Sequence, residues 1–312
     1  MTATRGFKDI EVTLLDSGNP EPFKMFWNWY RETWYSLRNQ EYDHTNPAHR
    51  AACEDVVAAR ALPIPQEALS FQVRVEGLSR VGLAQFTRGR IGWAYVVTSQ
   101  MPEAIEHAVT VPTNVYDFGF GNEAEELVAK SQELYDKMLA AGIPPQDCRY
   151  LTIHGQQTNL TCVVNFMALK GYFARRCENG LTDELNLVGR KILCELKKVH
   201  LNANGTDKVA GSGWSFLMRK LEAMGAAHGV CLNTDKVFGN TGRMKPAGHF
   251  IPSLTNEALP CDYDFSKSAW YRELKQLPDE LLFSGEREMI NDWNTIGFKA
   301  RLRKLESELE SE

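Results

Sequence analysis

Alternation of hydrophobic and polar residues predicts two strands near the start of the chain. The segment DIEVTLLDSG reads as a first strand followed by a turn, and ALSFQVRVEGLS places Phe71, Val73 and Val75 on one face. Between them, PEPFKMFWNWYRETWYSL is typical of a helix rich in aromatic residues. We interpret Trp27 and Trp34 as packing residues, with stacking on a ligand as the alternative.

Helical spacing marks further segments. The clearest helix, NEAEELVAKSQELYDKMLAAG, runs from Asn122 to about Ala141. Asn122 is suited to cap its start, and Gly142 followed by Pro144 is suited to end it. Its expected buried stripe consists of Leu127, Leu134, Met138 and Ala141. A shorter helical pattern between Arg80 and Arg88 puts on one side Val81, Ala84, Gln85 and Arg88.

The second half of the chain is less regular. The first half of CRYLTIHGQQTNLTCVVNFMALKGYFARR reads as strand and loop, and the segment from Asn165 reads as a helix that ends in Arg175 and Arg176. NANGTDKVAGSG and NTDKVFGNTGRMKPAGHF are loop-like, and FKARLRKLESELESE is a charged helix with a solvated face. We expect one domain over residues 1–202 and an extension over residues 203–312, helical and loop, packed on that domain.

Composition limits the class of partner. With 43% hydrophobic and 24% charged residues, the chain of 312 residues is that of a globular protein. Its net charge of −5 provides no general basic field, so we expect neither nucleic acid nor membrane as a partner. No apolar run reaches the roughly 20 residues that span a bilayer, and MTATRGFKDIEVTLL lacks the apolar centre of a signal peptide. Seven cysteines without a CxxC pair also favour a cytoplasmic location.

Several familiar catalytic patterns are absent from the sequence. It has no GxxxxGK[ST], GxSxG or HExxH motif, and GFGNEA lacks the third glycine of a dinucleotide fingerprint. The seven histidines show no metal-ligand spacing, and a proline separates His44 from His49. We therefore expect no metal site and interpret the histidines as structural or solvated.

The arginines are more informative. Arg88, Arg90, Arg149, Arg175 and Arg176 lie in three segments that mix apolar positions with a few polar groups. A guanidinium near buried surface needs an acceptor, and its fork matches the oxygens of a phosphate. Each arginine alone fits a salt bridge, whereas together they permit an anion pocket.

The same segments resemble a known family. QFTRGRIGWAYVVTSQ resembles the signature R-H-R-x-x-S-x-N-x-x-S-x-R of the flavin-dependent thymidylate synthases. LAAGIPPQDCRYL and VVNFMALKGYFARR are similar to that family's G-x-P-x-x-x-A-R and N-A-R-S-L-x-N-F-x-x-x-R region, in the same order and at similar separations. The resemblance covers roughly Asp9 to Lys198 and points to a divergent member similar to UMP/dUMP methylases.

The resemblance implies a mixed α/β (α+β) fold with a central sheet and flanking helices, and a homotetramer with its sites at subunit interfaces. It also implies FAD, a pyrimidine nucleoside monophosphate as substrate, methylenetetrahydrofolate as carbon donor and NADPH as reductant. Flavin carries the difficult chemistry in such enzymes, so the protein mainly binds and orients. No cysteine nucleophile is required.

The resemblance assigns site residues to this chain by their position in the family signature. The resemblance implies that the nucleotide is bound by Gln85, Arg88, Thr98, Ser99, Gln100, Arg149 and Arg176. It implies catalytic roles for three of these, namely Arg88, Thr98 and Arg176. It places against the cofactor Arg88, Gly89, Arg90 and Asn165.

This sequence departs from the family pattern at several positions. Gly89 stands where the signature has its histidine, and Gln100 stands where it has its last arginine. Trp93 and Tyr95 replace a serine and an asparagine. On the flavin-side helix an arginine and an asparagine are replaced by Met167 and Gly171.

Three functions therefore stay open on the sequence. The first is flavin-dependent C5 methylation of dUMP or UMP, in a specialised nucleotide or nucleoside pathway. The second is C5 hydroxymethylation of dCMP or dUMP, in which water replaces hydride at the last step. The third is a non-catalytic nucleotide-binding relative that has lost flavin.

Overall fold

A computed structural model describes residues 2–59, 63–99, 108–176, 183–226 and 278–281. The chain divides into two compact units. The first unit is Met1–Leu169 with Lys198–Trp214, and the second is Lys170–Lys197 with Ser215–Glu312. The sequence-based boundary at residue 202 stays a prediction.

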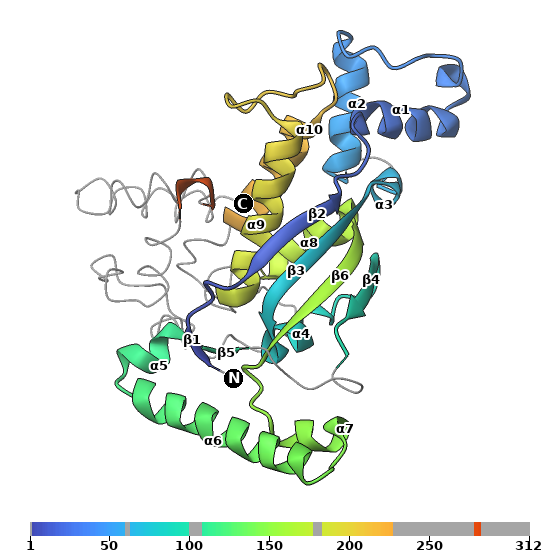
Figure 1. Ribbon diagram of the computed structural model, residues 1–312. Coiled ribbons are helices and arrows are strands. Elements are labelled where there is room, and N and C mark those ends of the chain that lie inside the picture. The colour runs from blue at the N-terminus through green and yellow to red at the C-terminus, as the bar shows by residue number, and fades with distance from the viewer. Residues whose placement is uncertain (1, 60–62, 100–107, 177–182, 227–277, 282–312) are drawn as a thin grey trace, which may run out of the picture. The chain divides into compact units, whose positions relative to one another are not determined.

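A four-stranded antiparallel sheet forms the centre of the first unit. Its strand order is β2 (Glu11–Asp16), β3 (Ser70–Ser79), β6 (Gln157–Asn165) and β4 (Trp93–Val97), as Figure 1 shows. The edge strands are therefore β2 and β4, and the central strands are β3 and β6. This sheet and the helices around it confirm the expected mixed α+β class.

One face of the central strands is buried, as the alternation predicted. Phe71, Val73 and Val75 are each 0% exposed. Opposite them in β6 lie the buried partners Val164, Cys162 and Leu160. Because successive side chains of a strand alternate between faces, this pairing fixes the register of the sheet.

A second, two-stranded sheet lies in the same unit. It pairs β1 (Ala3–Arg5) with β5 (Val109–Val111) in parallel. Its buried valines pack with Val128 of the helix α6 (Gly121–Ala140). The main sheet is continued by a short helix, α4 (Arg80–Phe86), which follows β3 directly and is capped by the Ser79 hydroxyl.

Gly77 occupies an irregular point of β3. The register with β6 shifts between Val75 and Leu78, and Gly77 has φ +73°. A Cβ there would lie 2.3 Å from the carbonyl oxygen of Asp9. Both the left-handed backbone and the close approach of another backbone therefore require glycine.

Gly77→Ala is expected to lower the free energy of unfolding by more than the 1–3 kcal/mol or so that left-handed strain alone costs, because the backbone of Asp9 must also move. Gly142→Ala is the matched control, since Gly142 has φ +84° and nothing within 4 Å of its Cβ position. Thermal unfolding of both variants checks this. Equal losses would show that the close approach at Gly77 contributes nothing.

Three helices near the N-terminus pack on one another. They are α1 (Pro22–Thr33), α2 (Pro47–Val57) and α3 (Pro65–Ala68). The expected aromatic helix is thus α1. Trp27 is 2% exposed and confirms its packing role, whereas Trp34 lies just beyond the helix end and is 51% exposed. Trp34 is therefore mainly a surface residue rather than part of the core.

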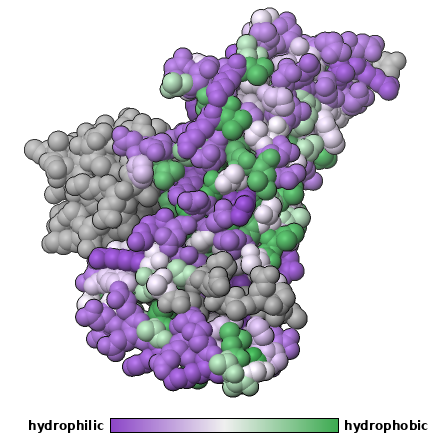
Figure 2. Space-filling view, in the orientation of Figure 1, coloured by the Kyte–Doolittle hydropathy of each residue, from purple (hydrophilic) through white to green (hydrophobic). Residues whose placement is uncertain are grey.

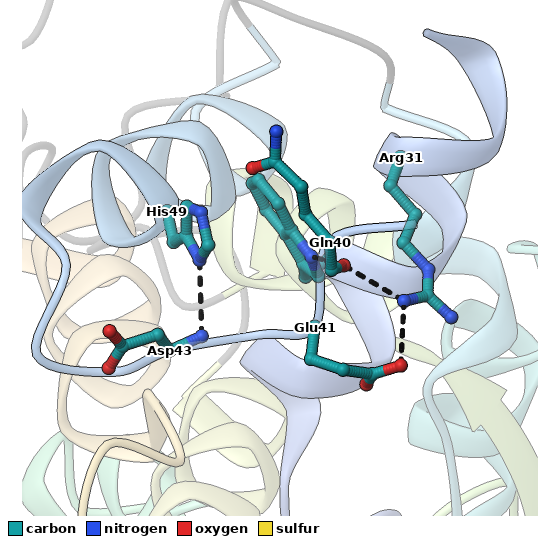
Figure 3. A network of polar contacts seen from close by, with 6 residues as sticks. Arg31, Gln40, Glu41, Asp43 and His49 are labelled. Carbon is teal, nitrogen blue, oxygen red and sulfur yellow. Dashed lines mark hydrogen bonds and ion pairs between the residues drawn. The ribbon is translucent and has the colours of Figure 1, made fainter. Parts of the chain in front are cut away.

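A polar network ties α1 to the loop that follows it and to α2. Arg31 donates to the Gln40 carbonyl (2.8 Å) and to the Glu41 carboxylate (3.2 Å), as Figure 3 shows. His49 accepts from the Asp43 backbone N–H (3.1 Å) and stacks on Trp27 at a ring distance of 3.9 Å. Both contacts make His49 a structural residue, in line with the sequence interpretation.

The helix α6 differs from its predicted burial pattern. It starts at Gly121, and Phe120 rather than Asn122 occupies the cap position, without a side-chain hydrogen bond. Its buried residues are Gly121, Val128 and Tyr135. The predicted stripe is wrong for Leu127 and Leu134, which are 59% and 46% exposed, and for Ala141, which is exposed, whereas Met138 is partly buried.

The buried stripe of α6 is shifted by one residue from the predicted one, from Leu127 and Leu134 to Val128 and Tyr135. The stripe through Val128 and Tyr135 faces β5 and the helix α7 (Pro145–Cys148). Leu127 and Leu134 precede these residues and so turn towards solvent. Figure 2 shows one face of the molecule, on which hydrophobic residues form patches among a majority of hydrophilic ones in the described part. The predicted stop is confirmed, since Gly142 has φ +84° directly after the C-cap.

Helices dominate the described part of the second unit. It contains most of α8 (Phe166–Arg176), α9 (Asp183–His200) and α10 (Trp214–Ala226). The predicted helix ending in Arg175 and Arg176 is confirmed as α8, whereas α9 and α10 were not predicted individually. Tyr172 donates to the Leu185 carbonyl at 2.7 Å and joins α8 to α9. NTDKVFGNTGRMKPAGHF and the charged terminal helix lie outside the described residues.

Candidate functional site

The loop after α4 is held against the start of α8. The Tyr95 hydroxyl donates to the Gly89 carbonyl and lies 3.4 Å from the Phe86 carbonyl oxygen. At the other end of the loop, the Asn165 backbone N–H donates to the Gly92 carbonyl at 3.0 Å. Gly92 has φ +76°, and a Cβ there would lie 2.7 Å from Asn165 Oδ1. The loop that carries Arg88, Gly89 and Arg90 therefore lies next to Asn165.

An aromatic cluster surrounds Gly89. The rings of Trp93 and Tyr95 stack at 5.7 Å with an interplanar angle of 13°, and Phe86 meets both edge-on. A Cβ at Gly89 would lie 3.3 Å from Trp93 Nε1. The indole therefore occupies the space into which a larger side chain at position 89 would extend, so Gly89 and Trp93 depend on each other.

Gly89→His is expected to lower the thermal unfolding midpoint and to shift the tryptophan fluorescence, because the imidazole displaces the Trp93 ring. The double variant Gly89→His with Trp93→Ser is expected to recover more than half of that loss. Additive effects of the two substitutions would contradict the dependence of one residue on the other.

Thr98 lies at the far end of β4, close to Arg80. Its backbone N–H donates to the Asn159 carbonyl at 3.0 Å. Its carbonyl oxygen lies 3.5 Å from Nη2 of Arg80, the first residue of α4. Burial and the positive charge of Arg149 both lower the pKa of Arg80. Thr98 and Arg80 thus meet at one end of the sheet.

Arg149 is fixed by its neighbours along the chain. It begins the short 3-10 helix η2 (Arg149–Leu151), directly after the buried Cys148. Its carbonyl accepts hydrogen bonds from the Thr152 N–H (3.2 Å) and hydroxyl (2.8 Å). Its guanidinium is half-buried and has no carboxylate partner among the described residues. The backbone is therefore fixed while the guanidinium is available to a ligand.

The structure brings most of the predicted site residues into the first unit. Arg88, Gly89, Arg90 and Asn165 gather at the start of β4. Thr98 and Arg149 lie at its end, and Gln85 is half-buried on α4 between the two groups.

Three predicted residues are less well placed. Ser99 follows Thr98, is exposed, and makes a further contact. Arg176 is half-buried at the end of α8, in the second unit, and makes a further contact. Gln100 lies outside the described residues.

Sequence reasoning missed the part played by Arg80 and by the aromatic cluster. The signal for Arg80 was its place at the start of the predicted helix, where one turn and a half separates it from Gln85. The signal for the cluster was the coincidence of a lost side chain at Gly89 with two gained rings at Trp93 and Tyr95. The contacts of Gly89 with Trp93 and Tyr95, and of Arg80 with Thr98, form only when the strand and the loop fold together.

Among the histidines, cysteines and carboxylates that the structure describes, no group of three or more is placed to hold a metal ion. His200 stacks on Trp214 at 3.7 Å, and its Nε2 lies 2.8 Å from the Ser17 carbonyl oxygen, so it is a packing residue. None of the described helices is long and apolar enough to cross a membrane.

Lys170 is a further unusual cation, in the second unit. It is 9% exposed on α8, and burial together with the charge of Lys220 lowers its pKa from 10.5 to about 8. Between pH 8 and 10.5 the unfolded chain therefore binds this proton more strongly than the folded chain does. The contribution of Lys170 to stability rises with pH across that window.

Lys170→Met is expected to flatten that rise, because the substitution removes the buried charge that folding must desolvate at lower pH. The measurement is the thermal midpoint of both proteins between pH 7.5 and about 10.5, taken as a difference so that other titrating groups cancel. Parallel pH profiles would contradict the lowered pKa.

The fold and site define a class of protein: an α+β protein whose antiparallel sheet carries an aromatic cluster at one end of an edge strand and Arg80 at the other. The family model described as thymidylate synthase complementing protein matches residues 20–200. The chain belongs to this family.

Individual relatives agree with this assignment. A flavin-dependent thymidylate synthase of Sulfurisphaera tokodaii is 30% identical over 133 residues, covering 40% of this chain and 49% of the relative. One of Saccharolobus solfataricus is 29% identical over 132 residues, again 40% and 49%. The chain thus spans about half the length of these curated relatives.

A solved structure shares the fold. The UMP/dUMP methylase PolB from Streptomyces cacaoi, bound with 5-Br dUMP, is similar with a TM-score of 0.53 and 17% identity. The similarity covers 64% of this chain and 93% of PolB. At this identity the likeness supports the α+β fold alone.

Proposed function

We propose that this protein is a flavin-dependent enzyme that methylates C5 of a pyrimidine nucleoside monophosphate, UMP or dUMP. The carbon donor is methylenetetrahydrofolate, the reductant is NADPH, and the pathway is a specialised nucleotide or nucleoside pathway. The relatives are named flavin-dependent thymidylate synthases, and PolB is named a UMP/dUMP methylase.

One observation carries the proposal: Arg149, which is expected to bind the nucleotide, is not used up by an ion pair to a described carboxylate. Arg149 is half-buried beside Arg80, and within the described ranges it has no carboxylate partner. An arginine whose role is a structural salt bridge would have such a partner. The arrangement therefore favours the anion pocket over the salt-bridge interpretation.

The residues around β4 fit FAD. Arg88 and Arg90 are exposed and, among the described side chains, without ion pairs, so they are available to the diphosphate. The half-exposed Trp93 and Tyr95 rings offer an apolar surface of the kind on which a planar ring system packs. Asn165 Oδ1 accepts from the Ala168 N–H, which leaves its amide N–H groups as donors.

In this proposal the protein binds the nucleotide and the flavin and orients them relative to each other. Arg149 and Arg176 hold the nucleotide through charge-assisted hydrogen bonds, and Thr98 and Gln85 add neutral donors and acceptors. When bound, flavin supplies the hydride that completes the methyl group. Arg88 lies on the loop after α4, in the group at the start of β4, and helps to position the base. A second subunit completes the site in the expected homotetramer.

Flavin binding tests the proposal most simply. The purified protein, after addition of FAD and removal of excess, is expected to be yellow with the absorbance bands of bound flavin. Thermal shifts with UMP, dUMP and dCMP then report nucleotide binding, because a ligand of the native state raises stability. Equal shifts with all three nucleotides, or none, would contradict a selective monophosphate site.

A non-catalytic nucleotide-binding protein is the second candidate. Two observations favour it. The histidine that the family pattern places against flavin is replaced by Gly89, and the Trp93 indole occupies the space that a larger side chain at position 89 would need. A colourless protein that binds UMP or dUMP but gives no signal with added FAD would support this candidate over the enzyme.

A further inference from the structure

A cleft opens in the first unit beside the end of β2. One side is the turn that follows this strand, with Ser17, Gly18 and Pro20, and the other is the end of α9 with the loop after it. The cleft has a volume of about 330 Å³, and small-molecule sites in proteins occupy roughly 300–1,000 Å³. None of the described residues that line it is assigned to the nucleotide or the flavin.

Two stacked rings form the base of the cleft. The rings of His200 and Trp214 lie 3.7 Å apart with an interplanar angle of 8°, and both side chains are buried. Trp214 Nε1 donates to the Asn19 carbonyl at 3.1 Å, and His200 Nε2 lies 2.8 Å from the Ser17 carbonyl oxygen. Because these bonds tie both rings to the turn after β2, the shape of the cleft is fixed without a ligand.

The upper part of the cleft is apolar and open to solvent. Val199 and Val209, which both line it, are 43% and 44% exposed. The Ser212 backbone N–H donates to the Val209 carbonyl at 3.1 Å, so the loop holds this valine in position. A ligand with an apolar body would remove both side chains from water, which is favourable in proportion to the area covered.

Lys208 supplies the charge of the cleft. Its backbone N–H donates to the His200 carbonyl at 2.9 Å, and its Nζ donates to the Lys198 carbonyl at 2.7 Å. An ammonium group has three donors, so two remain for a ligand. Lys208 is the one ionised side chain among the described residues that line the cleft, since burial lowers the pKa of His200 and leaves its imidazole neutral at pH 7.

This charge selects an anion of one kind. Two remaining donors match the two oxygens of a carboxylate, whereas a phosphate dianion needs more donors and more positive charge than one ammonium offers. The neighbouring carboxylate of Asp207 accepts from the Gly213 backbone N–H at 2.9 Å and is not among the lining residues. A cationic ligand would therefore meet only the like charge of Lys208.

We propose that this cleft binds a small organic monocarboxylate with an apolar body. The carboxylate pairs with the Lys208 ammonium, and the body lies over the stacked rings between Val199 and Val209. Such a site goes beyond the proposed function, because it lies by β2, at the edge of the sheet opposite to β4.

Isothermal titration with 4-phenylbutyrate and with its neutral amide, 4-phenylbutanamide, tests the role of Lys208. The unsubstituted protein is expected to bind the carboxylate about 10-fold more tightly than the amide, because only the carboxylate gains a charged hydrogen bond. Lys208→Gln should abolish this difference. Lys130→Gln, an exposed lysine of α6 that pairs with Glu126, is the matched control and should preserve it. Equal affinities of the unsubstituted protein for the two probes, or no binding of the carboxylate, would overturn the proposal.

A second pair of variants tests the position of the ligand. Val209→Glu puts a negative charge and a larger side chain into the cleft, so it is expected to weaken binding of 4-phenylbutyrate at least 10-fold. Leu134→Glu adds the same charge at a side chain of α6 that is 46% exposed, and it should bind like the unsubstituted protein. Thermal unfolding shows whether both variants are folded. Equal binding by the two variants would place the probe elsewhere and overturn the proposal.

The nucleotide separates this site from the proposed function. Saturating dUMP is expected to leave the affinity for 4-phenylbutyrate unchanged. Competition between the two would place the probe in the nucleotide site, so the cleft proposal would fail while the proposed function stands. Binding of the probe that Lys208→Gln weakens, in a protein that binds no nucleotide, would leave the cleft proposal standing without the proposed function.

Discussion

Arg149→Ala is expected to lower the affinity for UMP or dUMP by roughly 100-fold, because two charge-assisted hydrogen bonds of about 1.5 kcal/mol each are lost. The Thr98 and Gln85 side chains cannot replace this fork, since both are neutral. Isothermal titration measures the loss, and steady-state kinetics should show it in kcat/KM. Arg176→Ala is expected to weaken binding in the same direction.

Folding must be checked in the same variants. The Arg149 guanidinium has no carboxylate partner within the described residues, so its removal should leave the thermal midpoint nearly unchanged. Arg74→Ala, which breaks a surface ion pair, provides the reference for an arginine outside the site. If Arg149→Ala unfolds the protein, or leaves nucleotide affinity intact, Arg149 is a structural residue.

Phe71→Ala is expected to cost about 3–5 kcal/mol of unfolding free energy. The ring is 0% exposed in the centre of β3, and it lies 6.0 Å from the ring of Trp214. Truncation therefore leaves a cavity between the sheet and Trp214. Because domains are commonly stable by only about 5–15 kcal/mol, the variant should unfold at a much lower urea concentration.

Phe118→Ala is the matched control, because the same atoms are removed from a side chain that is 77% exposed. Its urea midpoint should differ little from that of the unsubstituted protein. Similar losses in the two variants would mean that the buried face of β3 does not form the core of the first unit.

Local pattern was enough to predict the elements that frame the site. Strict alternation identified β3 and its buried face, because a strand with one side in the core needs that pattern. Gly142 identified the end of α6 through its left-handed backbone. The stripe of α6 failed because Leu127 and Val128 are both hydrophobic, and only the packing against β5 decides between them.

The candidate site was predictable to a smaller extent. The resemblance identified Arg88, Thr98, Arg149 and Asn165, which the fold then brings to the two ends of β4. The proximity of Arg80 to Arg149 joins positions far apart in sequence, and no periodicity encodes such a contact. The dependence of Gly89 on Trp93 likewise appears only when strand and loop fold together.

The central claim is that the protein transfers a one-carbon unit to C5 of a uridine monophosphate and reduces it to a methyl group. The most direct test is to incubate it with FAD, NADPH, methylenetetrahydrofolate and UMP or dUMP, and to measure the mass of the nucleotide product. The account predicts a gain of one CH2 on the base that depends on FAD. An unchanged nucleotide, or a gain of CH2O that indicates hydroxymethylation, would contradict it.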